Sequence, residues 1–405
     1  MQIAIIGGGA AGIFSAITCA ETNPHAKIIV FEKNNNLLSK VKISGGGRCN
    51  VTHACFDNDV LREYYPRGKK ELRNPFLQFS TKETIEWFQK HGVKLKTESD
   101  GRIFPKTDDS QTIIDCLLQK IYQLRIHIKM RSGISSIIKR ETGFELTLQN
   151  KEKFLCDKVI VATGGNPEIK NYEWLTQIGI NIISPVPSLF TFNIPNSPFK
   201  GLEGISVNPC SVKILSTSLQ QTGALLLTHW GVSGPAVLTL SAFGARVLKE
   251  MNYQFSISLN FFPAKTEKEV EEYFHQLKKE HPTKTIINTK IDVLSQRLWE
   301  RICTISEIGD DVRWVNLSKQ QMQKILRTIF HCELFVQGKT TFKEEFVTAG
   351  GVDLKEVEMK TLESKKISGL FFAGEILNID GVTGGFNFQN AWTTGWIAGK
   401  NAALY

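Results

Sequence analysis

A glycine motif near the N-terminus is the first group of residues in this 405-residue chain that could do chemistry. Residues 7–12 read Gly-Gly-Gly-Ala-Ala-Gly, the GxGxxG pattern, and Glu32 follows 20 residues after Gly12. Its first glycine permits a tight turn, its second lets a pyrophosphate approach the backbone, and its third lets a helix pack on a strand. Unpaired N–H groups at the helix start attract phosphate oxygens. We predict a dinucleotide on this turn, with the Glu32 carboxylate on its ribose hydroxyls.

Three later features favour FAD over NAD as that dinucleotide. The chain returns to the nucleotide domain at its C-terminus, which suits an elongated cofactor. Residues 161–165 (Val-Ala-Thr-Gly-Gly) end an apolar run in a turn of small residues. Residues 373–375 (Ala-Gly-Glu) end another, and residues 384–388 (Gly-Gly-Phe-Asn-Phe) open a helix whose N-terminus could stabilise negative charge on a reduced flavin. No second GxGxxG follows, so NAD(P)H, if used, would dock transiently against the flavin.

Residues 44–52 (Ser-Gly-Gly-Gly-Arg-Cys-Asn-Val-Thr) are the most unusual stretch. Three successive glycines permit backbone shapes that other residues cannot adopt. Arg48 could neutralise a phosphate or orient an anionic ring edge, and Asn50 and Thr52 offer further hydrogen bonds. We predict that this loop contacts the flavin; the alternative is a flexible surface loop.

Two candidates for chemistry remain. His229, in the glycine-rich segment 228–235, could protonate a substrate while flavin N5 delivers hydride, or its hydrogen bonds could only hold the loop. Cys49 and Cys55 could form a redox pair, but their Cx₅C spacing differs from the Cx₄C of flavin disulfide reductases. We therefore favour incidental thiols.

A basic cluster raises the question of nucleic acid. Lysine and arginine number 49 against 40 acidic residues, a net charge of +9. The cluster comprises Arg62, Arg67, Lys69, Lys70 and Arg73, with Tyr64, Tyr65 and Phe76 interleaved. Such a surface could bind RNA phosphates and stack bases. A solvated basic face is the preferred interpretation, so we expect a small-molecule substrate rather than nucleic acid.

The elements that must position these residues follow from the hydrophobic pattern. Apolar runs at residues 2–6 and 27–32 flank a small-residue helix at 11–20, which is a βαβ unit. Further helices are predicted at 80–92 and 110–124, a half-exposed strand at 143–148, and buried strands at 158–162 and 369–374.

The pattern changes after about Pro185, where prolines crowd among short β-like runs. We predict an FAD-binding domain at 1–188 and 346–405, interrupted by a β-barrel domain at 189–345 with a helical insertion at about 264–330. Capping boxes at Thr266/Glu269 and Ser318/Gln321 mark two of its helices. The predicted fold class is thus α/β, with a split Rossmann domain.

Composition excludes several classes of protein. With 41% hydrophobic and 22% charged residues, the chain is globular rather than disordered. The eight cysteines include no CxxC pair and no leader peptide is evident, so we expect reduced thiols in a cytoplasmic protein without a metal site. The uncharged stretches 222–245 and 381–399 are too polar to cross a bilayer.

The chain resembles the bacterial flavoproteins of the BaiN/RdsA type, also called aminoacetone oxidase-like or YhiN-like. The matching segments are GGGAAG (7–12), KISGGGRCNVTH (42–53), GRIFPKTDDSQT (101–112), VATGG (161–165), THWGVSGPAVL (228–238), TAGGV (348–352) and AGEILNIDGVTGGFNFQNAWTTG (373–395). The resemblance implies non-covalent FAD and a glutathione-reductase-like FAD domain interrupted by a β-barrel. His53 and Asn378 depart from the family pattern, which has asparagine and aspartate there.

Together these observations predict an FAD-dependent oxidoreductase that reduces a small organic substrate with NAD(P)H, in a cleft between the two domains. The alternatives are amine oxidation by oxygen, a flavin-dependent RNA-binding or RNA-modifying protein, and a flavoprotein without turnover. We expect His229 to be catalytic. The expected cofactor contacts are Gly7, Gly9, Ala10, Ala11, Gly12, Glu32, Lys33, Lys42, Ser44, Gly45, Gly46, Arg48, Cys49, Asn50, Thr52, Ile134, Ala162, Thr163, Gly164, Gly374, Glu375, Gly385, Phe386, Asn387 and Phe388.

Overall fold

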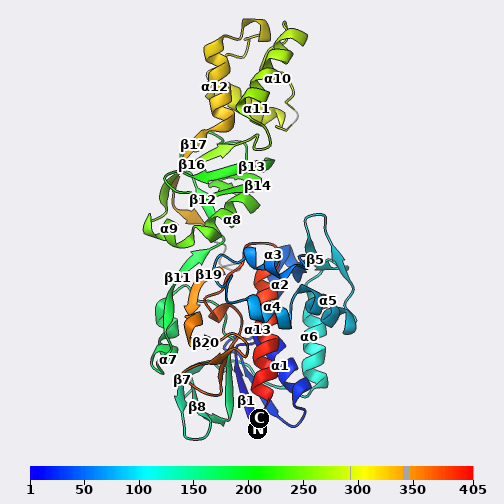
Figure 1. Cartoon of the computed structure of the whole chain (residues 1–405), viewed down its shortest axis with the longest axis vertical. Helices are drawn as coiled ribbons and strands as arrows, with labels where there is room; N and C mark the ends of the chain where they lie inside the picture. Colours follow the sequence, from blue (N-terminus) through cyan, green and yellow to red (C-terminus); the bar gives the residue numbers. More distant parts are fainter. Residues whose placement is uncertain (292, 341–346, 405) are drawn as a thin grey trace. The chain divides into compact units, whose positions relative to one another are not determined.

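The computed structural model describes residues 1–291, 293–340 and 347–404 (Figure 1). Contacts between Cα atoms divide the chain into two compact units. Unit 1 joins residues 1–188 to residues 342–405, and unit 2 consists of residues 189–341. The boundaries predicted from the sequence lie at 188/189 and 345/346, and the second of them lies outside the described residues.

A mainly parallel sheet lies at the centre of unit 1, in the order β20-β21-β22-β10-β1-β2-β6. Ile6 of β1 pairs with Val161 on one side and with Phe31 on the other. Residues 3–6 are all buried, as expected for a parallel strand covered on both faces. The strands are β1 (Gln2–Ile6), β2 (Lys27–Phe31), β6 (His127–Lys129), β10 (Lys158–Val161), β20 (Val357–Glu358), β21 (Glu363–Ser364) and β22 (Leu370–Phe372). This sheet confirms the predicted α/β class.

Two helices from opposite ends of the chain pack together in unit 1: α1 (Ala10–Thr22) and α13 (Phe386–Ala403) (Figure 1). Glycines make this approach possible. A Cβ on Gly395 would lie 2.8 Å from the Ala11 carbonyl oxygen, and one on Gly399 would lie 2.5 Å from that of Ser15. The last segment of the chain is therefore part of the nucleotide domain's core.

The remaining helices of unit 1 include one, α6, that is as long as α1. Helix α5 begins after Ser80, whose capping box with Glu83 is formed as the sequence predicted. The helices are α2 (Ser39–Gly47), α3 (Asn58–Glu63), α4 (Arg73–Gln78), α5 (Thr81–Lys90), α6 (Gln111–Gln123) and α7 (Glu173–Thr176).

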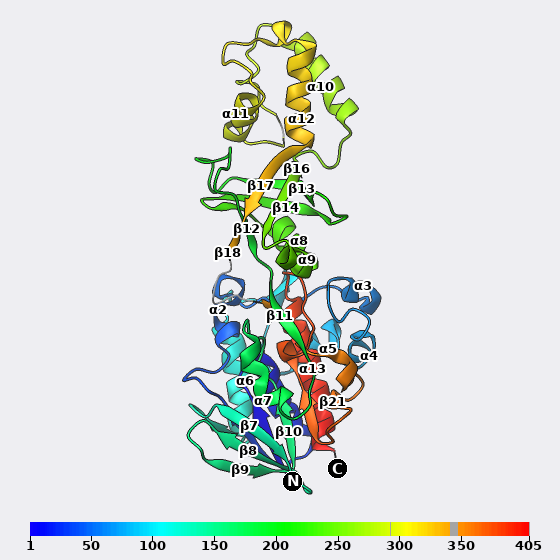
Figure 2. The same cartoon turned by 90° about the vertical axis from the view of Figure 1, so that its left-hand side faces the viewer.

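Three small sheets complete unit 1, of which Figure 2 shows β7, β8 and β9 side by side. They are β3 (Thr52–His53) with β5 (Arg102–Pro105) and β4 (Leu95–Thr97); β7 (Ile134–Lys139) with β8 (Phe144–Leu148) and β9 (Lys153–Cys156); and β11 (Ile182–Ser188) with β19 (Val347–Val352). The prediction of a half-exposed strand at 143–148 was wrong, because four of the five β8 residues are buried. Glu145 breaks the expected alternation because its carboxylate pairs with Arg140 and Lys153.

A closed antiparallel sheet forms the β part of unit 2. Its order is β17-β16-β13-β14-β15-β12-β18, and β17 and β18 are separated by Gly338 alone. The stretch 332–340 therefore pairs with β16 at its start and with β12 at its end, which closes the barrel. The strands are β12 (Thr191–Asn193), β13 (Ser206–Ile214), β14 (Gln220–Thr228), β15 (Gly231–Ser233), β16 (Gln254–Asn260), β17 (Cys332–Gln337) and β18 (Lys339–Thr340).

The helices of unit 2 are α8 (Pro235–Phe243), α9 (Ala245–Glu250), α10 (Glu267–Glu280), α11 (Gln296–Ile305) and α12 (Lys319–Phe330). The last three form the helical insertion beside β16 and β17 (Figure 2). Both predicted capping boxes, at the starts of α10 and α12, are present. Buried Trp299 and Trp314 donate their indole N–H groups to the Ile286 carbonyl oxygen and the Thr289 hydroxyl. None of the described helices combines the length and hydropathy needed to span a membrane.

Candidate cofactor-binding site

The turn between β1 and α1 gives each motif glycine a distinct environment. A Cβ on Gly7, whose φ is +113°, would lie 2.3 Å from the Ala162 carbonyl oxygen. One on Gly12 would lie 1.9 Å from the Gly7 oxygen, so the helix packs on the turn only because Gly12 has no side chain. A Cβ on Gly9 would meet no atom within 4 Å. The turn thus leaves open space where the motif predicts a pyrophosphate, before the helix start formed by Ala10 and Ala11.

Glu32 lies at the end of β2 and faces this turn. Its buried carboxylate accepts hydrogen bonds from Gly8 N and Asn34 N, both at 2.8 Å. Each carboxylate oxygen keeps acceptor capacity for a ribose hydroxyl. The Glu32 carbonyl accepts from Ser132 N at 2.8 Å, which brings the start of β7, with Ile134, toward the same strand end. Lys33 is exposed.

The ends of β10 and β22 meet the same turn. Ala162 N donates to the Ile6 carbonyl, and a Cβ on Gly374 would lie 2.7 Å from Ala11 Cβ. The Glu375 carboxylate forms an ion pair with Lys40 Nζ at 2.7 Å and accepts a hydrogen bond from Thr348 N at 2.9 Å. Thr163 is exposed, and Gly164 adopts a φ of +73° beside Glu375. The two small-residue motifs predicted to contact a cofactor therefore converge on the GxGxxG turn.

The glycine loop of residues 44–47 follows a kink in α2. Ser44 is extended, and Gly45, Gly46 and Gly47 all have positive φ, at +59°, +69° and +85°. A Cβ on Gly46 or Gly47 would meet no atom within 4 Å. Three consecutive residues with positive φ are readily formed only by glycine. The shape of the loop therefore depends on the three glycines themselves and not on a hydrophobic period.

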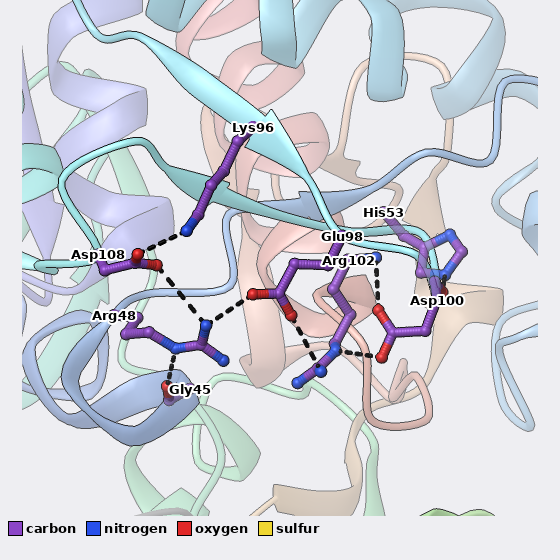
Figure 3. A network of polar contacts seen from close by, with 8 residues as sticks. All are labelled: Gly45, Arg48, His53, Lys96, Glu98, Asp100, Arg102 and Asp108. Atoms are coloured by element: carbon purple, nitrogen blue, oxygen red, sulfur yellow. Dashed lines mark hydrogen bonds and ion pairs between the residues drawn. The ribbon is translucent and has the colours of Figure 1, made fainter.

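Arg48 does not present a free guanidinium. Its Nη1 lies 2.7 Å from Glu98 Oε1 and 3.6 Å from Asp108 Oδ1 (Figure 3). The guanidinium carbon lies 4.0 Å from the centre of the Phe104 ring. The hydrogen bond to Glu98 raises the pKa of the guanidinium. The structure therefore assigns Arg48 to two carboxylates, where the sequence suggested a phosphate or a ring edge. Lys42 Nζ likewise donates to Gln111 Oε1.

The start of α13 lies against the segment that follows the glycine loop. A Cβ on Gly385 would lie 2.8 Å from Asn50 Oδ1, a buried oxygen that has no hydrogen-bond partner among the described residues. The half-buried Asn387 exchanges two 2.8 Å hydrogen bonds between its side-chain amide and the Gly381 backbone. Phe386 is buried, and Phe388 stacks on Trp392 at 5.8 Å.

Thr52 and Cys49 point into the protein. The Thr52 hydroxyl donates to Gln389 Oε1 at 2.5 Å within a buried polar network on α13. Cys49 is fully buried, and burial raises the pKa of its thiol to about 12. Both Cys49 and Cys55 are free thiols. Cys49 is therefore not a thiolate at neutral pH.

His53 packs against the start of α13. Its ring stacks on Phe386 at 4.8 Å, and Nε2 lies 3.1 Å from the Asp100 carbonyl oxygen. Because a carbonyl only accepts, Nε2 carries the proton and Nδ1 is an acceptor, buried without a partner among the described residues. Burial lowers the pKa of His53. Asn378 Oδ1 is a similar buried acceptor.

A buried ion pair that the sequence analysis missed fixes the segment before α13. Asp380 is fully buried and receives two hydrogen bonds from the Arg67 guanidinium and a 2.7 Å hydrogen bond from the Ser188 hydroxyl. Burial raises the pKa of the Asp380 carboxyl, and the Arg67 charge opposes that rise. No local pattern links residues 313 positions apart.

The basic cluster is largely neutralised. Arg62 pairs with Asp59, Lys69 with Glu63, and Arg67 with Asp380. Of its interleaved aromatic residues, Tyr65 and Phe76 are buried and cannot stack on bases at the surface. The third, Tyr64, is half-buried and stacks on Phe386, with 4.3 Å between the ring centres.

His229 belongs to unit 2, in the turn between β14 and β15. Its side chain is 82% exposed, with Nδ1 3.8 Å from Glu203 Oε1. The backbone N–H of Gly201 lowers the pKa of Glu203. An exposed imidazole beside a carboxylate can exchange a proton with solvent or with a ligand.

The residues of unit 1 fit FAD. Gly9, Gly46 and Gly47, on the two loops predicted to hold the cofactor, all face open space. The buried acceptor Asn50 Oδ1 lies beside the predicted flavin-facing helix start. Buried polar atoms without partners are rare in proteins, and a ligand donor would satisfy this one. Among the described residues, no group of three or more His, Cys, Asp or Glu could hold a metal ion.

Comparison with known proteins points to one family. A family described as "HI0933-like protein Rossmann domain" matches residues 1–401. The chain is 28% identical to "3-dehydro-bile acid delta(4,6)-reductase" of Clostridium scindens, over 99% of both chains. It is 29% identical to "Ribosomal RNA dihydrouridine synthase" of Escherichia coli, over 98% of this chain and 96% of that protein. The Haemophilus influenzae protein of the same name is also 29% identical. These matches confirm the resemblance drawn from the sequence.

Solved structures show the same fold. The 3-ketosteroid-Δ4-(5α)-dehydrogenase of Rhodococcus jostii matches with a TM-score of 0.53 at 13% identity, over 100% of this chain and 97% of that one. The 3-ketosteroid Δ1-dehydrogenase of Sterolibacterium denitrificans matches with a TM-score of 0.52 at 10% identity, over 99% of both chains. At such identities the likeness concerns the fold alone.

Proposed function

The chain belongs to the HI0933-like family of FAD-dependent oxidoreductases. From this premise we propose that it reduces a carbon–carbon double bond conjugated to a carbonyl group, with NAD(P)H as electron donor. The observation that carries the proposal is what its full-length relatives have in common. One relative is named for reducing the Δ4,6 positions of a 3-dehydro bile acid, and two for making dihydrouridine from uridine. A 3-keto steroid with a Δ4 double bond and a uracil ring both contain a C=C conjugated to C=O.

Unit 1 supplies the residues that would hold the cofactor. Gly9 and the start of α1 would receive the pyrophosphate, and Glu32 would bind the ribose. The glycine loop and the start of α13 would line the flavin, with Asn50 Oδ1 as an acceptor for a ring N–H. When bound, FAD accepts a hydride at N5 and passes it to the substrate. The protein supplies position, charge and exclusion of water.

Reduction of a conjugated double bond also needs a proton. Hydride adds to the carbon β to the carbonyl, and a proton must reach the α carbon. We propose His229 as the proton donor, because an imidazole can carry and transfer a proton, its side chain is exposed, and its Nδ1 lies 3.8 Å from Glu203 Oε1.

The electron donor is tested first, by anaerobic mixing of the purified holoprotein with NADH or NADPH while the visible flavin absorbance is followed. Bleaching within seconds supports the proposed direction. A flavin that stays oxidised with both donors contradicts NAD(P)H dependence and would redirect attention to substrates that reduce the flavin themselves, including amines.

The acceptor is tested by adding substrates to the reduced protein. A 3-keto-4,6-diene steroid and a uridine-containing fragment of ribosomal RNA represent the two kinds of relative. Reoxidation of the flavin by either, with a product heavier by two hydrogen atoms, supports conjugated reduction. If neither these substrates nor simple enones reoxidise the flavin faster than buffer alone, the proposal fails.

A further inference from the structure

The hairpin β4–β5 and the turn after it, residues 95–110, enclose the glycine loop and are called here the clamp segment. Ser110 N donates to the Gly47 carbonyl at 2.8 Å, and the Ser110 hydroxyl donates to the Lys42 carbonyl at 2.7 Å. On the other side of the loop, Val51 N donates to the Ile103 carbonyl at 2.8 Å. The clamp segment therefore contacts both ends of the glycine loop.

Arg48 provides the side-chain connection between them. Its Nε lies 3.5 Å from the Gly45 carbonyl oxygen, while its Nη1 reaches Glu98 at 2.7 Å and Asp108 at 3.6 Å. Phe104 of β5 lies under the guanidinium, and its ring is 3.1 Å from where a Gly45 Cβ would be. One side chain thus joins the loop backbone to two carboxylates and a ring of the clamp segment.

Charges alternate along this connection (Figure 3). Lys96 pairs with Asp108, Asp108 and Glu98 flank Arg48, and Arg102 pairs with both Glu98 and Asp100. Glu98 is the one carboxylate here that hydrogen-bonds two guanidinium groups, through Oε1 and Oε2. Removing its charge would therefore disturb Arg48 more than removing the charge of Asp100, which contacts Arg102 only.

The loop needs such anchors for a physical reason. Gly45, Gly46 and Gly47 lose more conformational entropy on ordering than any other residue type would. Gly46 and Gly47 gain no packing in return, since nothing lies within 4 Å of a Cβ on either. The shape of the loop is therefore maintained from outside.

We propose that Glu98 is a positioning residue for the cofactor: by fixing Arg48, it holds the glycine loop in the shape that receives the flavin part of FAD. The inference rests on the proposed assignment of FAD to unit 1. Glu98 does not contact the cofactor in this account. It acts through Arg48 and Gly45.

The test compares FAD affinity of apoprotein carrying Glu98→Gln with that of Asp100→Asn. Both substitutions remove one carboxylate charge from the same hairpin, but only the Glu98 carboxylate contacts Arg48. We expect Glu98→Gln to weaken FAD binding about 5-fold, the upper range for a partly exposed ion pair, and Asp100→Asn to change it less than about 2-fold. Flavin fluorescence on titration of apoprotein gives both dissociation constants.

Two further readouts separate positioning from a general loss of stability. The urea midpoints of the two apoproteins should differ little. Glu98→Gln weakens contacts to Arg48 and Arg102, and Asp100→Asn weakens one contact to Arg102, but all three ion pairs are partly exposed and contribute little to stability. High salt should weaken FAD binding to wild type more than to Glu98→Gln, because salt screens the pair that the variant lacks. If Glu98→Gln does not fold, Arg48→Lys, which keeps the charge but loses the planar guanidinium, should show the same loss of affinity.

The outcomes are distinguishable. If wild-type apoprotein does not bind FAD, the proposed function fails. If it binds FAD, and Glu98→Gln matches Asp100→Asn in affinity and salt dependence, or Arg48→Lys binds as wild type, the positioning role of Glu98 is overturned.

Discussion

Replacing Gly9 by alanine should abolish tight FAD binding while leaving the fold intact. Gly9 precedes α1 with φ −84° and ψ −171°, which alanine adopts without strain. No atom of the described chain lies within 4 Å of the new Cβ. The helix-start preference of glycine over alanine costs up to about 1 kcal/mol, and the less flexible unfolded chain returns about 0.4–1 kcal/mol. The net change in the free energy of unfolding should therefore be close to zero.

The cofactor should be affected strongly, because the Cβ would occupy the space through which a pyrophosphate approaches the backbone. We expect at least about a 100-fold loss of FAD affinity, equivalent to about 2.7 kcal/mol. Gly12→Ala is the contrasting variant. Its Cβ would lie 1.9 Å from the Gly7 oxygen, so α1 would have to move and the apoprotein itself should be destabilised.

The assay measures two quantities on each apoprotein: the urea midpoint by circular dichroism and the FAD dissociation constant by flavin fluorescence. Gly9→Ala should change only the second, and Gly12→Ala should change both. A Gly9→Ala protein that binds FAD as tightly as wild type would refute the reasoning, because the open space at Gly9 would then not belong to the cofactor.

Three further predictions concern side chains. His229→Asn should leave flavin reduction by NAD(P)H unchanged but slow substrate reduction by about 100-fold or more, as seen in separate stopped-flow half-reactions; equal slowing of both would contradict a proton-donor role. Burial lowers the pKa of His53 in the folded state below the value of about 6.5 that it has in the unfolded chain. Just below pH 6.5 the unfolded chain therefore binds more protons than the folded protein, so the free energy of unfolding should fall as the pH drops through this range. In urea unfolding across this pH range, the free energy of unfolding of His53→Asn should fall less steeply with pH than that of wild type. Identical slopes for the two proteins would exclude a contribution from His53. Asp380→Asn should destabilise the protein by about 3–5 kcal/mol, because it removes the buried charge that faces Arg67; a urea midpoint within error of wild type would refute this.

Sequence alone was sufficient for the nucleotide turn and for the helix starts. GxGxxG, the apolar runs around it and Glu32 lie within 32 residues, and each constrains the next through local geometry. The capping boxes of α5, α10 and α12 likewise lie within four consecutive residues each. Hydrophobic period, glycine placement and capping are short-range properties, so a single sequence reveals them.

Partners of polar side chains required the tertiary structure. The sequence offered Arg48 for a phosphate, but a hairpin 50 residues away supplies Glu98 as its partner. It offered Asn387 as a flavin contact, and only the structure shows that the side-chain amide is bonded to the Gly381 backbone. Tyr65 and Phe76 looked available to bases and are buried.

The physical reason is the same in each case. A polar group is satisfied by whichever donor or acceptor the completed fold brings near, and that depends on strand order and loop closure over tens to hundreds of residues. Local composition determined that this chain carries a Rossmann-type dinucleotide turn and glycine loops. Only the packing of α13 on α1, and of the clamp segment around residues 44–47, decided which side chains face those loops and which are held by other parts of the protein.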